Sequence, residues 1–462
     1  MDFLIVLLSL CLLMFVAYRG FSVILFAPIA AMLAVLLTQP DAVPSMFTGI
    51  FMEKLAGFVR LYFPVFLLGA VFGKVIEISG FSKTIVRAVI GVVGVQRAML
   101  SIVLVCAILT YGGVSLFVVV FAVYPFAAEM FRSSDIPKRL IPGTVALGAF
   151  SFTMDALPGT PQIQNIIPST FFGTTTWAAP VLGVLGSVFI FVLGMAYLEF
   201  RRRTAKAQGE GYGTGHVNEP EPLSEENLPN PWVAILPLIV VGVMNKVLTS
   251  AIPIVFGTTQ KVQLVGHEPL ITQIGPVTAI WAVMGALILG ILTVLAFAWK
   301  AVAAKFAEGT KAAVAGSLLA SMNTASEYGF GGVIASLPGF LVIAGMLQAI
   351  PNPLVKIGVT VSALAGITGS ASGGLSIALA AMSGQFKEAA AAANIPLEVV
   401  HRVAAMASGG MDTLPHNGAV ITLLFVTGLS HRQSYGDIFA ITVLKTLAVL
   451  FVILVYYTTG IV

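Results

Sequence analysis

The sequence predicts an all-α polytopic membrane protein built from two similar halves. Of its 462 residues, 58% are hydrophobic and only 10% are charged, and the mean hydropathy is +0.99. A soluble domain of this length could not cover so much apolar surface. Apolar runs close to the roughly 20 residues that a membrane span needs recur from residue 3 to residue 460. One long polar stretch, 201–231, separates them into two groups.

The first half, residues 1–200, is expected to contain five transmembrane helices and one re-entrant hairpin. Straight spans are predicted at 3–18, 21–38, 61–79 and 178–199. The segment 98–131 is too long for one span and has the Gly-rich TYGGVS at its centre, so two half-helices are predicted to meet there. The segment 140–172 is predicted to be a broken span, because FTMDALPGTPQ (152–162) interrupts it with an aspartate, two prolines and a glycine.

The second half, residues 232–462, repeats this order after a linker at 201–231. Spans are predicted near 232–252, 276–298, 312–336 and 437–459, with a hairpin at 353–386 and a broken span at 401–429. MDALPGT (154–160) is matched by MDTLPHN (411–417), and the shift that carries Asp155 onto Asp412 also carries Tyr111 onto Thr368. Five crossings in the first half place the second half on the opposite side, so the halves are predicted to be inverted-topology repeats.

The positive charges give this layout an orientation. Lysines and arginines concentrate in the loops 83–97, 132–139, 201–206 and 300–311, which the positive-inside rule places in the cytoplasm. The predicted location is a bacterial cytoplasmic membrane, with a cytoplasmic linker and both termini outside. The outer loops are expected to hold six cations: Lys54, Arg60, Lys261, Lys356, Lys387 and Arg402.

The interruptions of the predicted helices suggest a central binding site. A helix break in hydrocarbon is stable only where it faces protein, a cavity or a ligand. Thr160 and Asn417 are predicted to cap the half-helices after the two breaks, and Ser115 and Ser372 to cap those at the hairpin tips. Free amides at such N-termini bind anions. Neither the tips nor the breaks contain lysine or arginine, so dipoles and hydroxyls are expected to hold a small carboxylate. The alternative is that these small residues serve close helix packing.

Ionisable groups at the breaks are the predicted coupling residues. Asp155 and Asp412 fall at the predicted membrane centre, where a carboxylate is a functional candidate, and His416 lies beside the second break. Each could carry a proton or instead make a structural hydrogen bond. Asn323 and Thr324, together with Glu327, lie on one predicted span, while Lys74 and Glu77 are interpreted as an interfacial pair.

The chain resembles the gluconate permease family of proton symporters. The resemblance is carried by FLLGAVFGKVIEISGFSKTIV (66–86), a following Gly-containing hairpin, the loops DIP (135–137) and NIP (394–396), and the Pro-rich breaks. The sequence looks most similar to members that carry 3-hydroxybutyrate. The resemblance implies a homodimer in which the early spans of each half form a scaffold and the hairpins and broken spans move as an elevator. It also implies a substrate site formed by the tips Thr110 to Ser115 and Gly369 to Gly374 and the loops Asp155 to Gln162 and Asp412 to Asn417.

Combining the motifs with the resemblance gives one predicted set of substrate-binding residues. Its members are Thr110, Tyr111, Gly112, Gly113, Ser115, Gly159, Thr160, Gln162, Asn165, Asn323, Thr324, Gly369, Ser370, Ser372, Gly373 and Asn417. The predicted function is proton-coupled symport of a small hydroxy-monocarboxylate, with no cofactor, metal or nucleic acid. A sodium-coupled carrier, a passive channel and an intramembrane aspartyl enzyme using Asp155 and Asp412 are the alternatives; the last requires two carboxylates close enough to share a proton.

Overall fold

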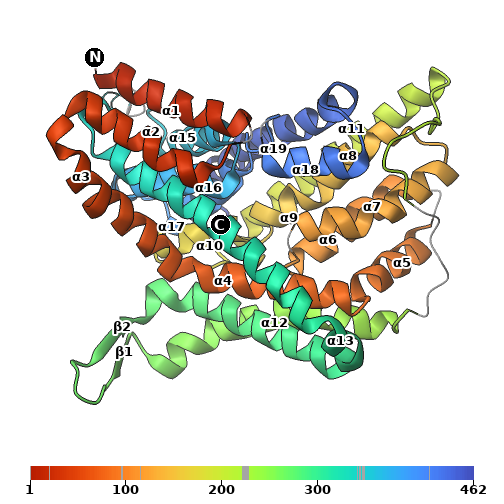
Figure 1. Cartoon of the computed structure of the whole chain (residues 1–462), viewed down its shortest axis with the longest axis horizontal. Helices are drawn as coiled ribbons and strands as arrows, with labels where there is room; N and C mark the ends of the chain where they lie inside the picture. The colour runs from red at the N-terminus through yellow and green to blue at the C-terminus, as the bar shows by residue number, and fades with distance from the viewer. Residues whose placement is uncertain are drawn as a thin grey trace.

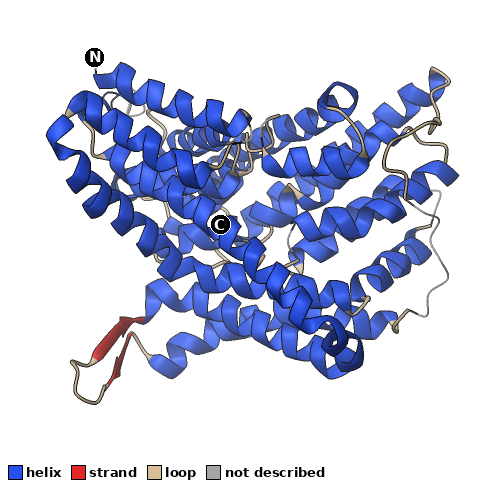
Figure 2. Cartoon of the chain, viewed as in Figure 1, coloured by secondary structure: helices blue, strands red, loops and turns tan. Residues whose placement is uncertain are grey.

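A computed structural model describes residues 2–19, 21–94, 97–114, 116–220, 228–340, 342, 345, 349–415 and 417–462. This part of the chain is helical apart from loops and one short β-hairpin (Figure 2). The first half contains α1 (Asp2–Tyr18), α2 (Val23–Thr38), η1 (Pro40–Ala42), α3 (Val43–Ser45), η2 (Met46–Phe51), α4 (Met52–Ile78), α5 (Phe81–Val93), α6 (Ala98–Tyr111), α7 (Leu116–Ser133), η4 (Lys138–Leu140), α8 (Ile141–Ala149), α9 (Phe152–Asp155), α10 (Ile163–Phe172) and α11 (Pro180–Ala207).

The second half is described from Pro231 to Thr459 as helices and one β-hairpin. It contains α12 (Pro231–Phe256), β1 (Thr259–Val262), β2 (Leu270–Gln273), α13 (Ile274–Ala335), α15 (Pro353–Thr368), α16 (Ala371–Ala392), α17 (Leu397–Ser408), α18 (Gly418–Thr427) and α19 (His431–Thr459). Among the described residues, five helical stretches are long and apolar enough to cross a membrane: Pro40–Ile78, Pro180–Ala207, Pro231–Phe256, Ile274–Ala335 and His431–Thr459. The prediction of an all-α polytopic membrane protein is therefore confirmed.

Two segments expected to be loops are helical, and one β-hairpin was not predicted. The stretch 40–60, expected to precede the third span as a loop, is helical and continuous with α4. The spans expected at 276–298 and 312–336 are two arms of α13, which bends at Ala298 (φ −130°, ψ 26°) (Figure 1). The intervening WKAVAAKFAEGTK (299–311) is charged but rich in alanine and lysine, which favour helix. An antiparallel β-hairpin, with Thr259 opposite Gln273, links α12 to α13 and was not predicted.

The two helices of each hairpin pack against each other, α6 against α7 and α15 against α16. The helices that follow the breaks instead pack against the opposite half. In the first half, α10 follows the break and contacts α16 and α17 of the second half; α18 follows the second break and contacts α7 and α8 of the first. The second arm of α13 crosses the molecule diagonally toward α2 in Figure 1, and α13 packs along α4. This exchange brings the two helix breaks into one central region.

Candidate functional site

The second break, residues 409–417, is tied to the tip of the second hairpin. Asn417 caps α18 by accepting hydrogen bonds from the backbone amides of Ala419 (2.7 Å) and Val420 (2.9 Å). Its Nδ2 donates to the carbonyl of Gly369 at 2.8 Å. The predicted cap is confirmed, and the same side chain joins the break to the hairpin.

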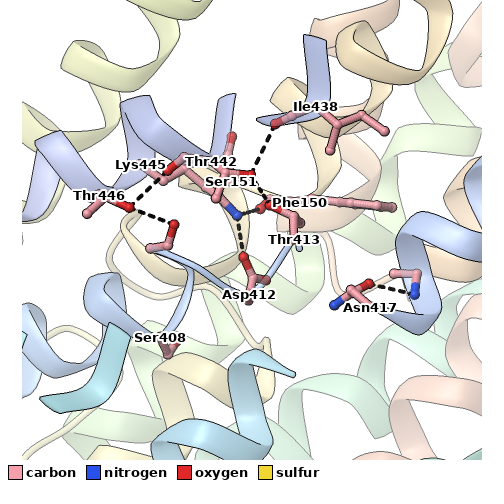
Figure 3. Close-up of polar contacts among 12 residues, drawn as sticks. Phe150, Ser151, Ser408, Asp412, Thr413, Asn417, Ile438, Thr442, Lys445 and Thr446 are labelled. Atoms are coloured by element: carbon pink, nitrogen blue, oxygen red, sulfur yellow. Dashed lines mark hydrogen bonds and ion pairs between the residues drawn. The ribbon is translucent and has the colours of Figure 1, made fainter. Parts of the chain in front are cut away.

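A buried ion pair joins this break to α19. Lys445 Nζ lies 2.5 Å from Asp412 Oδ1 and donates to the carbonyl oxygen of Phe150 at 3.0 Å (Figure 3). The side chains of Lys445 and Asp412 are only 2% and 6% exposed. Phe150 belongs to the first half, so Lys445 bridges the two halves. The tips and breaks themselves contain no lysine or arginine, but α19 places the ammonium of Lys445 at the second break.

Threonines of α19 hold the rest of the same loop. The hydroxyls of Thr413 and Thr442 are 2.5 Å apart, and Thr446 donates to the carbonyl oxygen of Gly410 at 2.7 Å. These contacts satisfy backbone and hydroxyl groups that a break would otherwise leave unpaired inside the membrane. The loop is thus fixed at several points around Asp412 (Figure 3).

At the first break, Arg402 of α17 binds backbone carbonyls. The side chain is fully buried, and its guanidinium donates to the carbonyl oxygens of Ala178 (2.8 Å) and Asp155 (3.1 Å) and to Asn165 Oδ1 (3.0 Å). The predicted position of Arg402 in an outer loop is wrong, because the residue lies buried within α17. Its five fixed donors match backbone and side-chain oxygens around the first break.

Asp155 is the buried carboxylate at the first break. Its side-chain oxygen Oδ2 has no hydrogen-bond partner within the described ranges. Lys445, Asp412 and Arg402 are near enough to interact with it electrostatically. A Cβ atom at Gly409 would lie 1.8 Å from Oδ2, so the backbone of the second break passes directly beside the carboxylate of the first. The predicted pair of aspartates therefore meets in one charged region.

Two predicted polar residues of the first break have protein partners. Thr160 is not the cap of α10: its hydroxyl donates to the carbonyl of Thr153 at 2.8 Å, and α10 begins only at Ile163. Asn165 is fully buried, and its Nδ2 donates to the carbonyls of Thr160 (3.0 Å) and Thr176 (2.9 Å). The chain stays extended through Gln162 (φ −75°, ψ 145°), which delays the start of the helix.

The first hairpin tip contacts this break directly. Gln162 Nε2 donates to the carbonyl of Thr110 at 2.7 Å, and the Tyr111 hydroxyl donates to the carbonyl of Pro158 at 3.0 Å. Gly113 has a φ of +95°, a left-handed conformation that favours glycine, whereas Gly112 has no room for a Cβ atom beside Leu238. Ser115 lies outside the described residues.

Ser370, rather than Ser372, caps α16 at the second tip. Its Oγ accepts a hydrogen bond from the Gly373 amide at 3.0 Å. Ser372 instead lies 3.2 Å from the Thr324 hydroxyl of α13. The sequence offered two serines within three positions, and only the backbone conformation decides which one reaches the free amide.

Glu327 of α13 reaches the same tip. It is buried, and its Oε2 has no hydrogen-bond partner among the residues that the structure describes. A Cβ atom at Gly373 would lie 1.9 Å from that oxygen. Asn323 is half-buried one turn away. The predicted interfacial pair Lys74–Glu77 is formed at 2.9 Å.

The other predicted site residues make packing or backbone contacts, or lie outside the residues that the structure describes. Trp177 occupies the space where a side chain at Gly159 would lie, while Asn245 donates to the Gly159 carbonyl at 2.8 Å. Gly369 has a φ of +63° at the second tip. His416 lies outside the described residues. Within the described ranges, no three His, Cys, Asp or Glu side chains are arranged to hold a metal ion.

Sequence reasoning missed Arg402 and Lys445 as site residues. The available signal was their position, since each cation lies in a largely apolar run, at 397–408 and 431–459. An ionisable residue inside a span is a functional candidate. Assigning Arg402 to a loop and leaving Lys445 unassigned concealed that signal.

Comparison with known proteins identifies the family. No family model matches the chain. The chain is 57% identical over 472 residues to the uncharacterized transporter YxjC of Bacillus subtilis (strain 168), with 100% of each covered. The solved structure of Neisseria gonorrhoeae MtrF, described within a class of antimetabolite efflux pumps, has 14% identity and a TM-score of 0.50 over 89% of this chain and 84% of that one. This similarity concerns the fold alone. The Alcanivorax borkumensis YdaH transporter has 16% identity and a TM-score of 0.48 over 92% and 90% of the two chains. The chain belongs to the membrane transporter family that includes YxjC.

Proposed function

We propose that the chain is a secondary active transporter that carries a small hydroxy-monocarboxylate together with protons. The observation that carries this proposal is the convergence of both helix breaks on the buried pair Asp412–Lys445, with the unpartnered oxygen of Asp155 nearby. A carboxylate oxygen without a partner inside a membrane protein favours uptake of a proton or a cation. The site therefore combines a fixed charge pair with a group that can change its charge.

The preference for an anionic substrate rests on the second tip. The N-terminus of α16 and the hydroxyls of Ser372 and Thr324 lie together there, and helix N-termini attract anions. These side-chain hydroxyls can also form hydrogen bonds with a hydroxyl group of the substrate. A proton on one of the aspartates would offset the negative charge of the acid during crossing. The attraction for an anion and the hydroxyl groups together favour a hydroxy acid such as 3-hydroxybutyrate or gluconate.

The proposed movement is an elevator. Helices α4 and α13, which pack along each other, belong to the scaffold, while the hairpins and broken helices carry the substrate. The halves 1–200 and 232–462 are proposed to be inverted repeats in a homodimer of a bacterial cytoplasmic membrane, with both termini outside. Protease protection of terminal tags in oriented vesicles tests the orientation: tags cleaved only from the cytoplasmic side would contradict it.

The function is tested by uptake into proteoliposomes. Labelled 3-hydroxybutyrate and gluconate are supplied with an inward proton gradient and no sodium, and then with a sodium gradient and no proton gradient. We expect accumulation in the first condition alone. Accumulation only with sodium would replace the proton by Na⁺, and uptake of neither acid in either condition would refute the proposed substrate class.

A variant tests whether coupling requires Asp412 of the fixed charge pair. Asp412→Asn removes the carboxylate but keeps its size, and we expect it to abolish gradient-driven accumulation. Glu77→Gln is the matched control, because it neutralises a carboxylate in the partly exposed Lys74–Glu77 pair and should leave accumulation unchanged. Wild-type accumulation by the Asp412→Asn variant would remove Asp412 from the coupling role.

A further inference from the structure

A polar cavity lies away from the helix breaks, between α4, α10 and α13. Its volume is about 300 Å³, and its lining includes Lys54 and Arg60 from α4, Thr170 from α10 and Tyr328 from α13. None of these residues belongs to the tips or breaks described above. Because α4 and α13 are the proposed scaffold and α10 belongs to a broken span, the cavity lies where the two proposed parts of the transporter meet.

The charges of this cavity are unbalanced in favour of cations. Lys54 and Arg60 line it together with one carboxylate, Glu53. In the part of the chain that the structure describes, none of these three side chains takes part in an ion pair. The stem of Lys54 packs against α13, because a Cβ atom at Gly332 would lie 2.7 Å from its Cγ. An anion entering the cavity would therefore meet two cations, and among the described residues neither of them is ion-paired with Glu53.

Hydroxyl groups and rings complete the lining. The Thr170 Oγ1 atom is buried and makes no hydrogen bond within the described ranges, and the Tyr62 hydroxyl is its polar neighbour. Tyr62 makes one long hydrogen bond, 3.4 Å, to the carbonyl of Ile167. The rings of Phe171 and Tyr328, 6.2 Å apart, form an apolar wall. Two cations, the Thr170 hydroxyl and an apolar wall suit a carboxylate with a short organic body.

We propose that this cavity is a second binding site for a small organic carboxylate, held by Lys54 and Arg60. The assignment of the ligand as the transported acid rests on the proposed function, whereas the preference for an anion rests on the cavity alone. A lipid headgroup offers the same anionic chemistry from the membrane side, so the experiment separates the two sources.

Cysteine labelling tests the charge preference without requiring transport. Gly57 lines the cavity and has open space where a side chain would be added. G57C is made in a Cys11→Ser background, since Cys11 is exposed and Cys106 is buried. Its reaction rate is measured with an anionic and a cationic methanethiosulfonate of similar size. The combined change Lys54→Gln/Arg60→Gln should lower the anionic-to-cationic rate ratio about tenfold or more, because each lost charge attracts one reagent and repels the other.

Val265→Cys is the matched control, since Val265 is 99% exposed in the β-hairpin loop. Its rate ratio should not respond to the same two substitutions. An unchanged ratio in the G57C variant would overturn the proposal, whereas an equal fall in both variants would show a general surface effect and also overturn it.

Protection separates the two sources of anion. We expect 3-hydroxybutyrate to slow anionic labelling of the G57C variant in liposomes of phosphatidylcholine alone. If 3-hydroxybutyrate has no effect and labelling is slowed only by adding phosphatidylglycerol to the liposomes, the cavity binds a lipid headgroup. That result would overturn the proposal of a soluble ligand. Protection without any uptake in the transport assay would support the cavity and refute the proposed function, so the two failures are distinguishable.

Discussion

Replacing Lys445 by methionine tests the central ion pair. Methionine keeps an unbranched side chain of similar length but removes the charge 2.5 Å from Asp412 Oδ1 and the donor 3.0 Å from the carbonyl of Phe150. Because both charged side chains are at most 6% exposed, the remaining carboxylate would be buried without a partner. Removing one partner of a buried pair costs about 3–5 kcal/mol. We expect that loss in the free energy of unfolding, and a similar loss for Asp412→Asn.

The double variant Lys445→Met/Asp412→Asn should be more stable than either single variant. It leaves neither charge of this pair without its partner, and the cost on the Lys445 side is the unsatisfied Phe150 carbonyl, about 1–3 kcal/mol. Unfolding is measured by titrating detergent micelles with sodium dodecyl sulfate and following the fluorescence of the four tryptophans. The control cycle uses Lys74 and Glu77, whose side chains are 28% and 44% exposed, and should give a coupling energy of about 1 kcal/mol or less. A double variant less stable than both single variants would refute the reasoning.

Three further predictions concern the other contacts. Arg402→Lys should lower the free energy of unfolding by about 3 kcal/mol or more in the same titration, because one ammonium cannot replace bonds to three separate oxygens; wild-type stability would contradict this. Gly373→Ala places a Cβ atom 1.9 Å from Glu327 Oε2 and should abolish acid uptake. Adding Glu327→Ala removes the clashing carboxylate and should restore uptake. Failure of the double variant to restore uptake would contradict this explanation. Hydrogen bonds from Arg139 lower the pKa of Glu210 in the linker, so this pair stabilises linker docking above the pKa of a free glutamate, about 4.3, and the contribution is lost as the pH falls through the lowered pKa. Hydrogen exchange of the backbone amides of residues 201–212, corrected for intrinsic rates, should therefore become faster below about pH 4. The Glu210→Gln variant should show the same increase at pH 7. Equal protection at pH 7 and pH 3 would exclude this role of the pair.

The fold class and the positions of the breaks could be predicted from sequence. Apolar runs of span length define transmembrane helices because lipid offers no hydrogen bonds to the backbone. The prolines and glycine of 152–162 interrupt a helix for local steric reasons, and Asn417 caps the next one through amides only two and three residues away. The two aspartates were found because a carboxylate in such a run has no ordinary packing role. These features depend on neighbouring residues, so a single sequence contains them.

Loop and cap details were less predictable, because small differences in backbone conformation decide them. Thr160 and Ser372 have suitable hydroxyls, but α10 begins at Ile163 and the α16 cap is Ser370. The charged segment 299–311 stays helical as part of α13, since polarity by itself does not end a helix.

The sequence alone determined a membrane-embedded helical chain with a carboxylate at each of two helix breaks. Only the tertiary structure decided which charges those carboxylates meet. Lys445 is 33 positions from Asp412, and Arg402 is 247 positions from the Asp155 carbonyl that it binds. Such partners are selected by the packing of α17 and α19 around the opposite half, and the pairing follows from the need to satisfy buried charges and broken-helix carbonyls where water is absent.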